Sequence, residues 1–483
     1  MRFRFFSLLF LPAAILWAVS GSAAAGSPQA VNAQTGETWN PPALLYTAGG
    51  DMFSPLLVSD QTGRLHLFWG LAQAPNVQNP AGGDILFYNQ KVGDSWSVPV
   101  DILSGQEIQT PSVTVDKNNT LHLVWLGTNR QMYYSQAPVE QAAHVRGWTP
   151  ALPIAAAFDQ PHILADASGR LHIVYSAASA DGINYITSED GGAHWSFPQH
   201  VSGSLSAYSG TSMPRIAVTG DGTLHVVWTE YRLPSGWPPT GVFYARSVDQ
   251  GQTWTRAAMI MGEGYDQINI AAQNNRTIHV VWNASVDIGG RFHRVSRDGG
   301  KTWSDPFQLT GEGGTEGLPQ IALDGSGRLH LVVSYSGCAW HFTWEDNTWS
   351  EPVCTRDGDT QVINLFPTQG LDIEEPTMTI SAGNQIHVVF WNNRERLWYT
   401  SARLSSARRV TAVPLYTRTP VLPTLTPTAR PTRTATTAPP LLPGQDTIIP
   451  SANPAHNLFA SLIPALALVG IVLALRLRAS RDH

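Results

Sequence analysis

Charged side chains are scarce in this sequence, and cysteine occurs only twice. Asp, Glu, Lys and Arg make up 14% of the 483 residues, against roughly 25% in ordinary soluble domains, so Ser, Thr, Asn and Gln must cover much of the surface. The net charge of −6 provides no basic field to attract a polyanion. Nucleic acid is therefore excluded as a partner.

A short strand pattern, in which a histidine follows Leu or Ile and precedes three apolar or aromatic residues, is repeated along the chain. The copies are Leu65–Trp69, Leu121–Trp125, Leu171–Tyr175, Leu224–Trp228, Ile278–Trp282, Leu329–Val333 and Ile386–Phe390. Their spacing of 50 to 57 residues is typical of a propeller blade. A Gly, Asn or Asp turn joins each copy to an apolar strand that precedes it. A third strand follows each copy, and then a fourth strand that begins with Trp. Four antiparallel strands make one blade.

The tryptophans that open the fourth strands give a second count of seven. They are Trp39, Trp96, Trp148, Trp195, Trp254, Trp303 and Trp349. Trp39 has no histidine strand before it, and the last histidine, His387, has no such Trp after it. We therefore predict an all-β, seven-bladed propeller over residues 36–405. Residues 38–46 supply the fourth strand of the last blade, so that the closed ring leaves no exposed strand edges. Six blades are the alternative.

The two ends of the chain differ in composition from the repeats. Residues 1–25 have a basic start, an apolar core and a small-residue cleavage site, which predicts a signal peptide, with a membrane anchor as the alternative. Residues 413–456 are rich in Pro and Thr and predict a disordered linker. Residues 458–475 lack charge and are long enough to span a bilayer, and the basic tail 476–483 places the C-terminus in the cytoplasm. The sequence thus predicts a cell-membrane protein with an extracellular propeller.

Cys338 and Cys354 lie at equal distances from Asp346, in a turn between the third and fourth strands of the sixth repeat. This placement predicts that they face each other across a hairpin. Because an exported domain is in an oxidising setting, we expect a disulfide worth roughly 3 kcal/mol. Two thiols alone do not make a zinc site.

Three of the turns between third and fourth strands share the pattern Ser-x-Asp-x-Gly-x-Thr-Trp. They occupy 188–195, 247–254 and 296–303, with His194 in place of Thr in the first. The pattern resembles the Asp box, or BNR repeat, of the sialidase superfamily, and the resemblance covers about residues 36–405. The carboxylates of Asp190, Asp249 and Asp298 are expected to bond turn amides and to mark the fold rather than to catalyse a reaction.

A binding site is expected on the opposite face, where the fourth-to-first and second-to-third strand connections lie and where long inserts occur. The sialidase resemblance implies three arginines on a substrate carboxylate, a Tyr nucleophile paired with a Glu, and an Asp acid/base. The catalytic candidates are Asp51, Glu230 and Tyr231; the ligand-binding candidates are Arg232, Trp237, Arg291 and Arg394. The family's early Arg-Ile-Pro segment is not recognisable, so no catalytic residue follows from a motif match.

The leading functional hypothesis is a surface-anchored propeller that binds glycan or another envelope ligand without hydrolysing it. The alternatives are a glycoside hydrolase of the exo-α-sialidase type and a protein–protein scaffold. We expect a monomer, attached to the membrane by one C-terminal helix. The repeated histidines are assigned to hydrogen bonds with a neighbouring strand rather than to a metal, because equivalent positions on separate blades cannot converge on one ion. No cofactor is expected, and no motif supports Ca²⁺.

Overall fold

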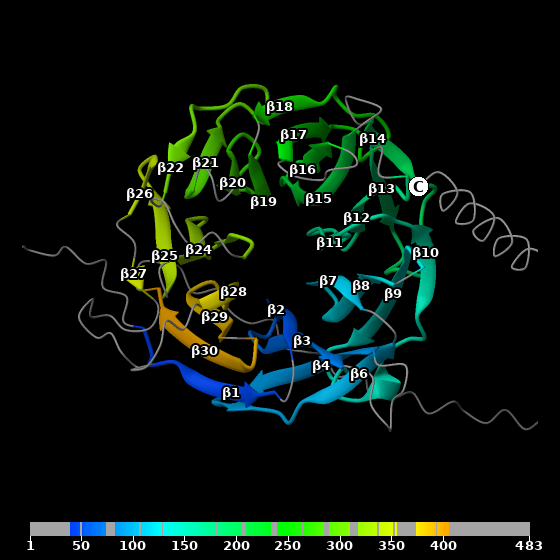
Figure 1. Ribbon diagram of the computed structural model, residues 1–483, viewed down its shortest axis with the longest axis vertical. Coiled ribbons are helices and arrows are strands. Elements are labelled where there is room, and N and C mark those ends of the chain that lie inside the picture. Colours follow the sequence, from blue (N-terminus) through cyan, green and yellow to red (C-terminus); the bar gives the residue numbers. More distant parts are fainter. Residues whose placement is uncertain are drawn as a thin grey trace, which may run out of the picture. The chain divides into compact units, whose positions relative to one another are not determined.

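The computed structural model describes residues 39–404, apart from gaps at 49–50, 74–82, 106–107, 128, 180–181, 204–208, 233–238, 263, 285–288, 310–316, 336–337, 351–352, 355–372 and 393. Within these residues the chain forms seven antiparallel sheets arranged around a centre, with one 3-10 turn, η1 (Val145–Gly147). Figure 1 shows the sheets as a ring, with the first strand of each sheet nearest the centre.

Each sheet is one blade, and its strands are named in order from the innermost outward. The first three blades comprise β2 (Met52–Ser59), β3 (Leu65–Gln73), β4 (Gly83–Val92) and β5 (Ser95–Trp96) with β6 (Val100–Gly105); β7 (Gln109–Val115), β8 (Thr120–Leu126), β9 (Gln131–Pro138) and β10 (Leu152–Ala156); and β11 (His162–Ala165), β12 (Leu171–Ser176), β13 (Gly182–Ser188) and β14 (Gln199–Gly203).

The remaining four blades follow the same order. They comprise β15 (Ser209–Val218), β16 (Leu224–Arg232), β17 (Pro239–Ser247) and β18 (Ala258–Met261); β19 (Tyr265–Ala272), β20 (Ile278–Ala284), β21 (Arg291–Ser296) and β22 (Phe307–Gln308); β23 (Gln320–Leu323), β24 (Leu329–Tyr335), β25 (Cys338–Glu345) and β26 (Thr348–Trp349) with β27 (Val353–Cys354); and β28 (Ile373–Ser381), β29 (Gln385–Asn392), β30 (Arg396–Arg403) and β1 (Ala43–Thr47).

The seventh blade takes its outermost strand from the other end of the chain. β1 pairs antiparallel with β30, with Leu44 opposite Trp398, and Trp39 forms an isolated bridge with Ala402. Figure 1 shows this junction as a dark-blue strand beside an orange one. The predicted seven-bladed ring and its closure by strand exchange are confirmed, and the six-bladed alternative is wrong.

In six blades the residue after the fourth-strand tryptophan carries a hydroxyl and fixes that strand to the third one. The backbone N–H of Ser97, for example, donates to the carbonyl of Gln90 at 2.8 Å, and the Ser97 hydroxyl accepts from the Gln90 N–H at 3.0 Å. The same exchange of two bonds joins Thr149 to Gln136. Other blades repeat it through Ser196, Thr255, Ser304 and Ser350. A hydroxyl residue after Trp therefore sets where the outer strand begins.

The strand histidines form a repeated buried contact. His122 Nδ1 lies 2.7 Å from the Tyr134 hydroxyl on the next strand, and the Tyr134 ring meets Trp195 of the following blade edge-on. His66, His172, His225 and His387 bond a tyrosine in the same way, whereas His279 and His330 bond a second histidine. The expected hydrogen bond to a neighbouring strand is confirmed. It also links each blade to the next.

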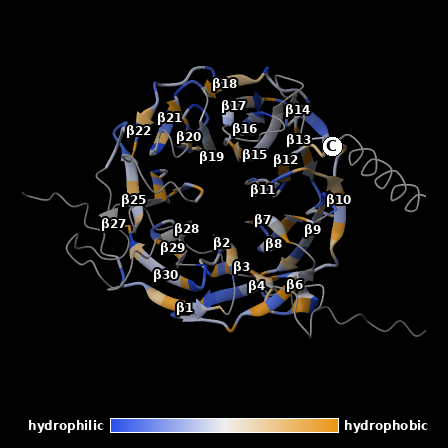
Figure 2. Cartoon of the chain, viewed as in Figure 1, coloured by the Kyte–Doolittle hydropathy of each residue, from blue (hydrophilic) through white to orange (hydrophobic). Residues whose placement is uncertain are grey.

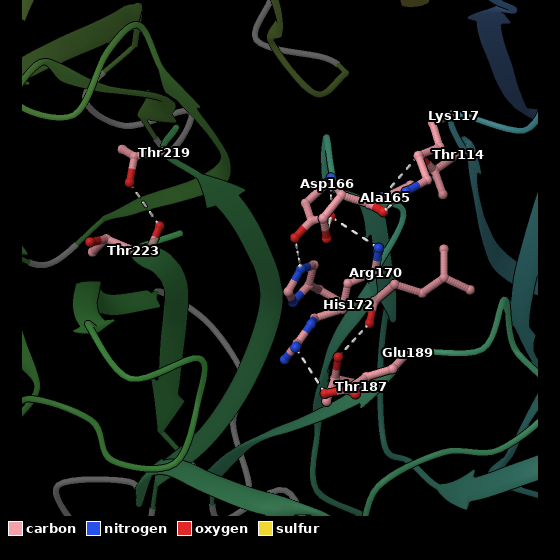
Figure 3. Close-up of polar contacts among 12 residues, drawn as sticks. Thr114, Lys117, Ala165, Asp166, Arg170, His172, Thr187, Glu189, Thr219 and Thr223 are labelled. Carbon is pink, nitrogen blue, oxygen red and sulfur yellow. Dashed lines mark hydrogen bonds and ion pairs between the residues drawn. The ribbon is translucent and has the colours of Figure 1, made fainter. Parts of the chain in front are cut away.

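A carboxylate completes this contact in four blades. Asp166 Oδ2 lies 3.3 Å from His172 Nε2, as Figure 3 shows, while the Asp166 Oδ1 atom accepts from the Ser168 and Arg170 backbone N–H groups. Although burial raises the pKa of the Asp166 carboxyl, the hydrogen bonds from His172 and Ser168 outweigh burial and hold it below its usual value. The aspartates equivalent to Asp166 are Asp60, Asp116 and Asp324. Each therefore ties a first-to-second strand turn to the buried histidine.

The Asp boxes lie in the turns between third and fourth strands. Asp249 Oδ1 accepts from the Thr253 N–H at 2.9 Å and from the Ser247 hydroxyl at 2.7 Å. Gly251 has a φ of 89°, and a Cβ there would lie 2.2 Å from the Tyr185 ring of the preceding blade. Only glycine meets both requirements. The boxes built on Asp190 and Asp298 repeat this arrangement.

The register of the sixth blade bears on the predicted disulfide. β27 pairs with β25 so that Cys354 is opposite Trp340, two residues from Cys338. The two cysteines are therefore not directly opposite, as the symmetric turn suggested. The turn pairs Glu345 with Thr348, which is one residue away from that symmetry, and the chain between β26 and β27 adds one more. Their side chains lie outside the described residues, and the disulfide stays a prediction.

Apolar residues fill the spaces between blades. Figure 2 shows hydrophobic segments in strands throughout the ring and also in outer strands such as β10. Among the described residues no helix is long and apolar enough to cross a bilayer. The predicted signal peptide, linker, membrane helix and basic tail lie outside the described residues.

Candidate functional site

The alternating strand direction places two kinds of connection on one face of the ring. The segments that enter innermost strands and the segments that join second to third strands share this face, which we call the connection face; the Asp boxes lie on the opposite face. All predicted catalytic and ligand-binding residues belong to connection-face segments. Trp237 is outside the described residues.

Asp51 and Arg394 meet at the boundary between the seventh and first blades. The N–H of Met52 donates to the Arg394 carbonyl at 2.8 Å, and the Asp51 carbonyl accepts from Ala72. Both side chains are exposed, and Arg394 has a φ of 52°. The structure therefore brings a predicted acid and a predicted arginine to neighbouring positions at the rim.

Glu230, Tyr231 and Arg232 end strand β16, where they pair with the beginning of β15. Glu230 is buried, Tyr231 is half-buried and Arg232 is exposed. A bulge between Glu230 and Tyr231 interrupts the regular alternation of side chains along β16. Of the three, only Arg232 is fully open to solvent at the rim.

Arg291 begins β21 and lies inside the wall of the ring. It is 1% exposed, and its Nη2 atom donates to the Ser334 carbonyl at 3.0 Å and to the Ser334 hydroxyl at 3.3 Å. Arg291 thus joins the fifth blade to the sixth. Arg232, Arg291 and Arg394 come from the fourth, fifth and seventh blades, and of these Arg291 alone is buried.

A cavity of about 280 Å³ lies at the centre of the connection face. Every blade contributes to its lining through the segment that enters its innermost strand. In six blades this segment contains an X-Pro pair: 54–55, 110–111, 160–161, 213–214, 318–319 and 375–376. Bulges interrupt β2, β7, β15, β19 and β28 at this level.

The backbone at these bulges is unusual. Thr110, Met213, Gln267 and Glu375, which all line the cavity, have φ values between 42° and 52°. This region is rare for residues other than glycine, and for a β-branched residue such as Thr110 it is an outlier. Such conformations concentrate at functional sites.

Polar groups of the third and fourth blades form a connected cluster in this cavity. The Arg215 Nη2 atom donates to Gln160 Oε1 at 3.2 Å, and the Gln160 N–H donates to Asp159 at 2.8 Å. The Ser212 hydroxyl donates to the other oxygen of Asp159. His162 Nδ1 accepts from the Ile216 N–H at 3.3 Å, so the proton of the neutral ring is on Nε2.

Burial sets the protonation of this cluster. It lowers the pKa of Arg215 to about 10, with Asp159 acting in the opposite direction, so the guanidinium stays charged at neutral pH. Burial, and then the nearby Arg215 charge, lower the pKa of His162 to about 3. The imidazole is therefore neutral.

The sequence places acidic residues at the entrances of five innermost strands, Asp51, Asp159, Asp266, Glu316 and Glu374, and predicts that arginines offset their charge. Asp159 accepts from Ser212 and Gln160, and Asp51 is exposed at the rim. Glu316 and the side chains of Asp266 and Glu374 lie outside the described residues. Arg215, which was not among the predicted ligand-binding residues, is close enough for the Asp159 charge to raise its pKa, but its described side-chain bonds go to Gln160 and the Pro214 carbonyl. The arginine pairing stays a prediction.

The cavity residues lie outside the long inserts, in which a binding site was predicted. Their signal is the X-Pro pair that six blades carry within or just before the innermost strand, since residues flanking the proline line the cavity. The positions after the proline carry Leu56, Ser112, His162, Arg215, Gln320 and Thr377. Arg215 is the one arginine or lysine in this set. The described residues contain no group of three His, Cys, Asp or Glu side chains suited to a metal ion.

Residues 84–336 match the family model described as the BNR repeat-like domain, and the chain belongs to this family. With its seven four-stranded blades and Asp boxes it is a sialidase-like propeller. No curated protein sequence matches the chain.

Solved structures share the fold at low sequence identity. An ulvan lyase of polysaccharide lyase family PL25 is 11% identical, with a TM-score of 0.52 over 77% of this chain and all of that one. A protein of unknown function from Dyadobacter fermentans is 12% identical, with a TM-score of 0.47 over 75% of this chain and 98% of that one. The NanB sialidase from Streptococcus pneumoniae is 13% identical, with a TM-score of 0.43 over 75% and 70% of the two chains.

Proposed function

We propose that this protein is a surface-anchored, extracellular propeller that binds glycan on its connection face. The observation that carries the proposal is the central cavity, to which all seven blades contribute hydroxyls, carboxamides or prolines, with one arginine. Sugar hydroxyls both donate and accept hydrogen bonds, and such a lining offers partners for them. Convergent polar groups in a pre-formed pocket are typical of small-ligand sites.

The ends of the chain support surface attachment. The signal peptide, the Pro/Thr-rich linker and the apolar segment 458–475 are predicted from composition. Strand β30 ends at Arg403 on the Asp-box face, because it runs away from the connection face. The described part of the chain therefore ends, after β30, on the side opposite the cavity.

Arg232, Arg394 and Trp237 are proposed as ligand contacts at the rim. We propose binding rather than hydrolysis because two parts expected of a sialidase centre are engaged within the blades. Glu230 is buried, and Arg291 is buried against Ser334. An open arginine clamp beside a Tyr–Glu pair would require both to face the ligand.

Glycan-array binding by the purified full-length chain tests the proposal. The double variant Arg232→Ala/Trp237→Ala is expected to abolish binding while the free energy of unfolding stays within about 1 kcal/mol of the parent. The matched control, Phe197→Ala/Arg256→Ala, removes an exposed aromatic residue and an exposed arginine away from the connection face, and should bind normally.

Unchanged array binding by the Arg232/Trp237 double variant would move the site off this rim. Turnover of a fluorogenic sialoside by the same preparation would replace the binding module with the hydrolase alternative. Binding without turnover, lost in the rim variant only, supports the proposal.

A further inference from the structure

Neighbouring blades are joined around the central channel by a repeated hydrogen bond. The side chain after the strand-entering proline accepts from a backbone N–H of the next blade. The bonds run from Leu57 N to Thr377 Oγ1 at 3.2 Å, from Ile163 N to Ser112 Oγ at 3.2 Å, and from Ile216 N to His162 Nδ1 at 3.3 Å. They give the innermost, edge-lying strands partners for donors that would otherwise lack them.

Arg215 occupies the equivalent position in the fourth blade and cannot take this role. A guanidinium donates hydrogen bonds but does not accept them. The N–H of Ile270 in the next blade bonds instead to Asn269 Oδ1, at 2.9 Å. Arg215 turns to its own blade and the preceding one, where it donates to the Pro214 carbonyl at 2.9 Å and to Gln160. This position therefore lacks the hydrogen bond that its equivalents accept from the next blade. It places a cation in the channel instead.

The hydrogen-bonding capacity that remains on this side of the cavity consists mainly of donors. Gln160 Oε1 is used by Arg215, His162 Nδ1 by Ile216, and Gln267 Oε1 by Asn283. Among the described residues, nothing accepts from the Nε2 groups of Gln160, His162 or Gln267. These N–H donors, with the guanidinium, all line one cavity.

Thr110 of the second blade lines the same cavity, and its backbone has a φ of 43°. Its Oγ1 atom is buried, and no described residue bonds to it. A buried hydroxyl without a partner and a positive φ at a β-branched residue both cost free energy. Such costs are concentrated at functional sites.

We propose that the channel cavity holds an oxyanion, a sulfate or carboxylate group, bound by Arg215 and the N–H groups of Gln160 and His162. N–H donors around a guanidinium match the several lone pairs of such a group. Two carboxylates bear on the site: Asp159 offsets part of the Arg215 charge, and Glu375, three blades further along the ring, lines the same cavity. The oxyanion side is therefore that of the third and fourth blades.

Where the oxyanion is a substituent of a sugar, this inference deepens the proposed glycan binding and rests on it. A free anion is the other source of such a group. The site is distinct from the rim arginines Arg232 and Arg394.

Calorimetric titration of the full-length chain with sodium sulfate, methyl glucuronide and methyl glucoside tests the inference. The glucuronide carries a carboxylate where the glucoside carries a hydroxymethyl group. We expect sulfate and glucuronide to bind, the glucuronide at least tenfold more tightly than the glucoside. Arg215→Met should weaken both anions at least tenfold and leave the glucoside unchanged. Glu375→Gln, the matched control across the cavity, should bind sulfate as well as the parent or more tightly.

Gln160→Glu provides a second variant that leaves Arg215 in place. It puts a carboxylate beside the guanidinium and should also weaken sulfate binding at least tenfold. If Arg215→Met does not fold, this variant tests the oxyanion site in its place. Absence of saturable sulfate binding, or equal binding by the parent and both variants, overturns the oxyanion site. Loss of neutral-glycan binding in the rim variant with sulfate binding retained separates the rim from this site. Sulfate binding with no glycoside binding assigns the site to a free anion and counts against the proposed function alone.

Discussion

The indole of Trp39 lies edge-on against the imidazole of His341, with ring centroids 5.4 Å apart and an interplanar angle of 69°. Trp39 precedes β1 in the seventh blade, and His341 belongs to β25 in the sixth. The same contact joins earlier blades through Tyr134–Trp195, Tyr185–Trp254 and Tyr244–Trp303. The N-terminal strand therefore supplies the last blade-to-blade contact of the ring as well as a strand pair.

Deleting residues 26–47 should destabilise the propeller far more than trimming a loop. The deletion leaves β30 with an unpaired edge and removes the indole that packs edge-on against His341. Trp39→Ala alone should cost about 3–5 kcal/mol, as other buried aromatic truncations do. Thermal unfolding of the two variants measures the effect, with a four-residue shortening of the connection 74–82 between β3 and β4 as the control. A deletion variant that unfolds at the parent's midpoint contradicts closure by strand exchange.

The repeated features of the fold were predictable because they are periodic in sequence. The histidine strand, the fourth-strand Trp and the missing partners of Trp39 and His387 gave the blade count and the closure. What periodicity does not show is the register inside a blade. Cys338 and Cys354 are symmetric about a turn in the sequence, yet the turn register and one added residue together shift their pairing by two residues.

The candidate site was less predictable, since a site depends on departures from the repeat. Arg215 is visible in the sequence as a charged residue after a strand-entering proline, but its meaning depends on the bond that equivalent residues make to the next blade. Burial also separated residues that the sequence grouped: Glu230 and Arg291 are inside the wall, whereas Arg232 and Arg394 are exposed.

Tyr134→Phe should destabilise the protein by about 1–3 kcal/mol, because it removes the hydroxyl that bonds buried His122 and leaves that imidazole nitrogen without a partner. The same hydroxyl lies 3.2 Å from the Gly191 carbonyl of the next Asp box. The neighbouring Tyr133→Phe is the matched control, as its hydroxyl only accepts from exposed Asn129. Chemical denaturation compares the two. Equal losses in both variants would show that the buried contact adds nothing.

Stability should fall as pH is lowered from 7 to 5. Burial lowers the pKa of His225 to about 4 and of His279 and His387 to about 3, the first and last helped by Arg246 and Lys91 respectively. Below pH 6.5 the unfolded chain binds protons that the folded chain does not, so stability is present above the unfolded pKa and lost with acid. Each such histidine contributes at most about 2 kcal/mol of this loss at pH 5.

Urea midpoints at pH 7 and pH 5 measure this dependence. His194 is the matched control, because its side chain is exposed and pairs only with Asp190 at 2.7 Å. His194→Gln should keep the full loss between the two pH values, whereas His225→Asn should reduce it. Midpoints that coincide at pH 7 and pH 5 would mean that these imidazoles are not kept neutral by the fold.

The Asp box should matter for folding and not for ligand binding. Asp249 accepts from the Thr253 N–H and hydroxyl and from the Ser247 hydroxyl. The hydrogen bonds from Thr253 lower the pKa of this carboxyl to about 2, so it is ionised at neutral pH and has no proton to give as a general acid. Asp249→Ala removes all three hydrogen bonds from the turn that precedes Trp254, and should lower the thermal midpoint by about 2–4 °C. Glycan and sulfate binding by the folded variant should equal the parent's, because the turn lies on the face opposite the cavity. A variant with the parent's midpoint but no ligand binding would make the Asp-box face the functional one.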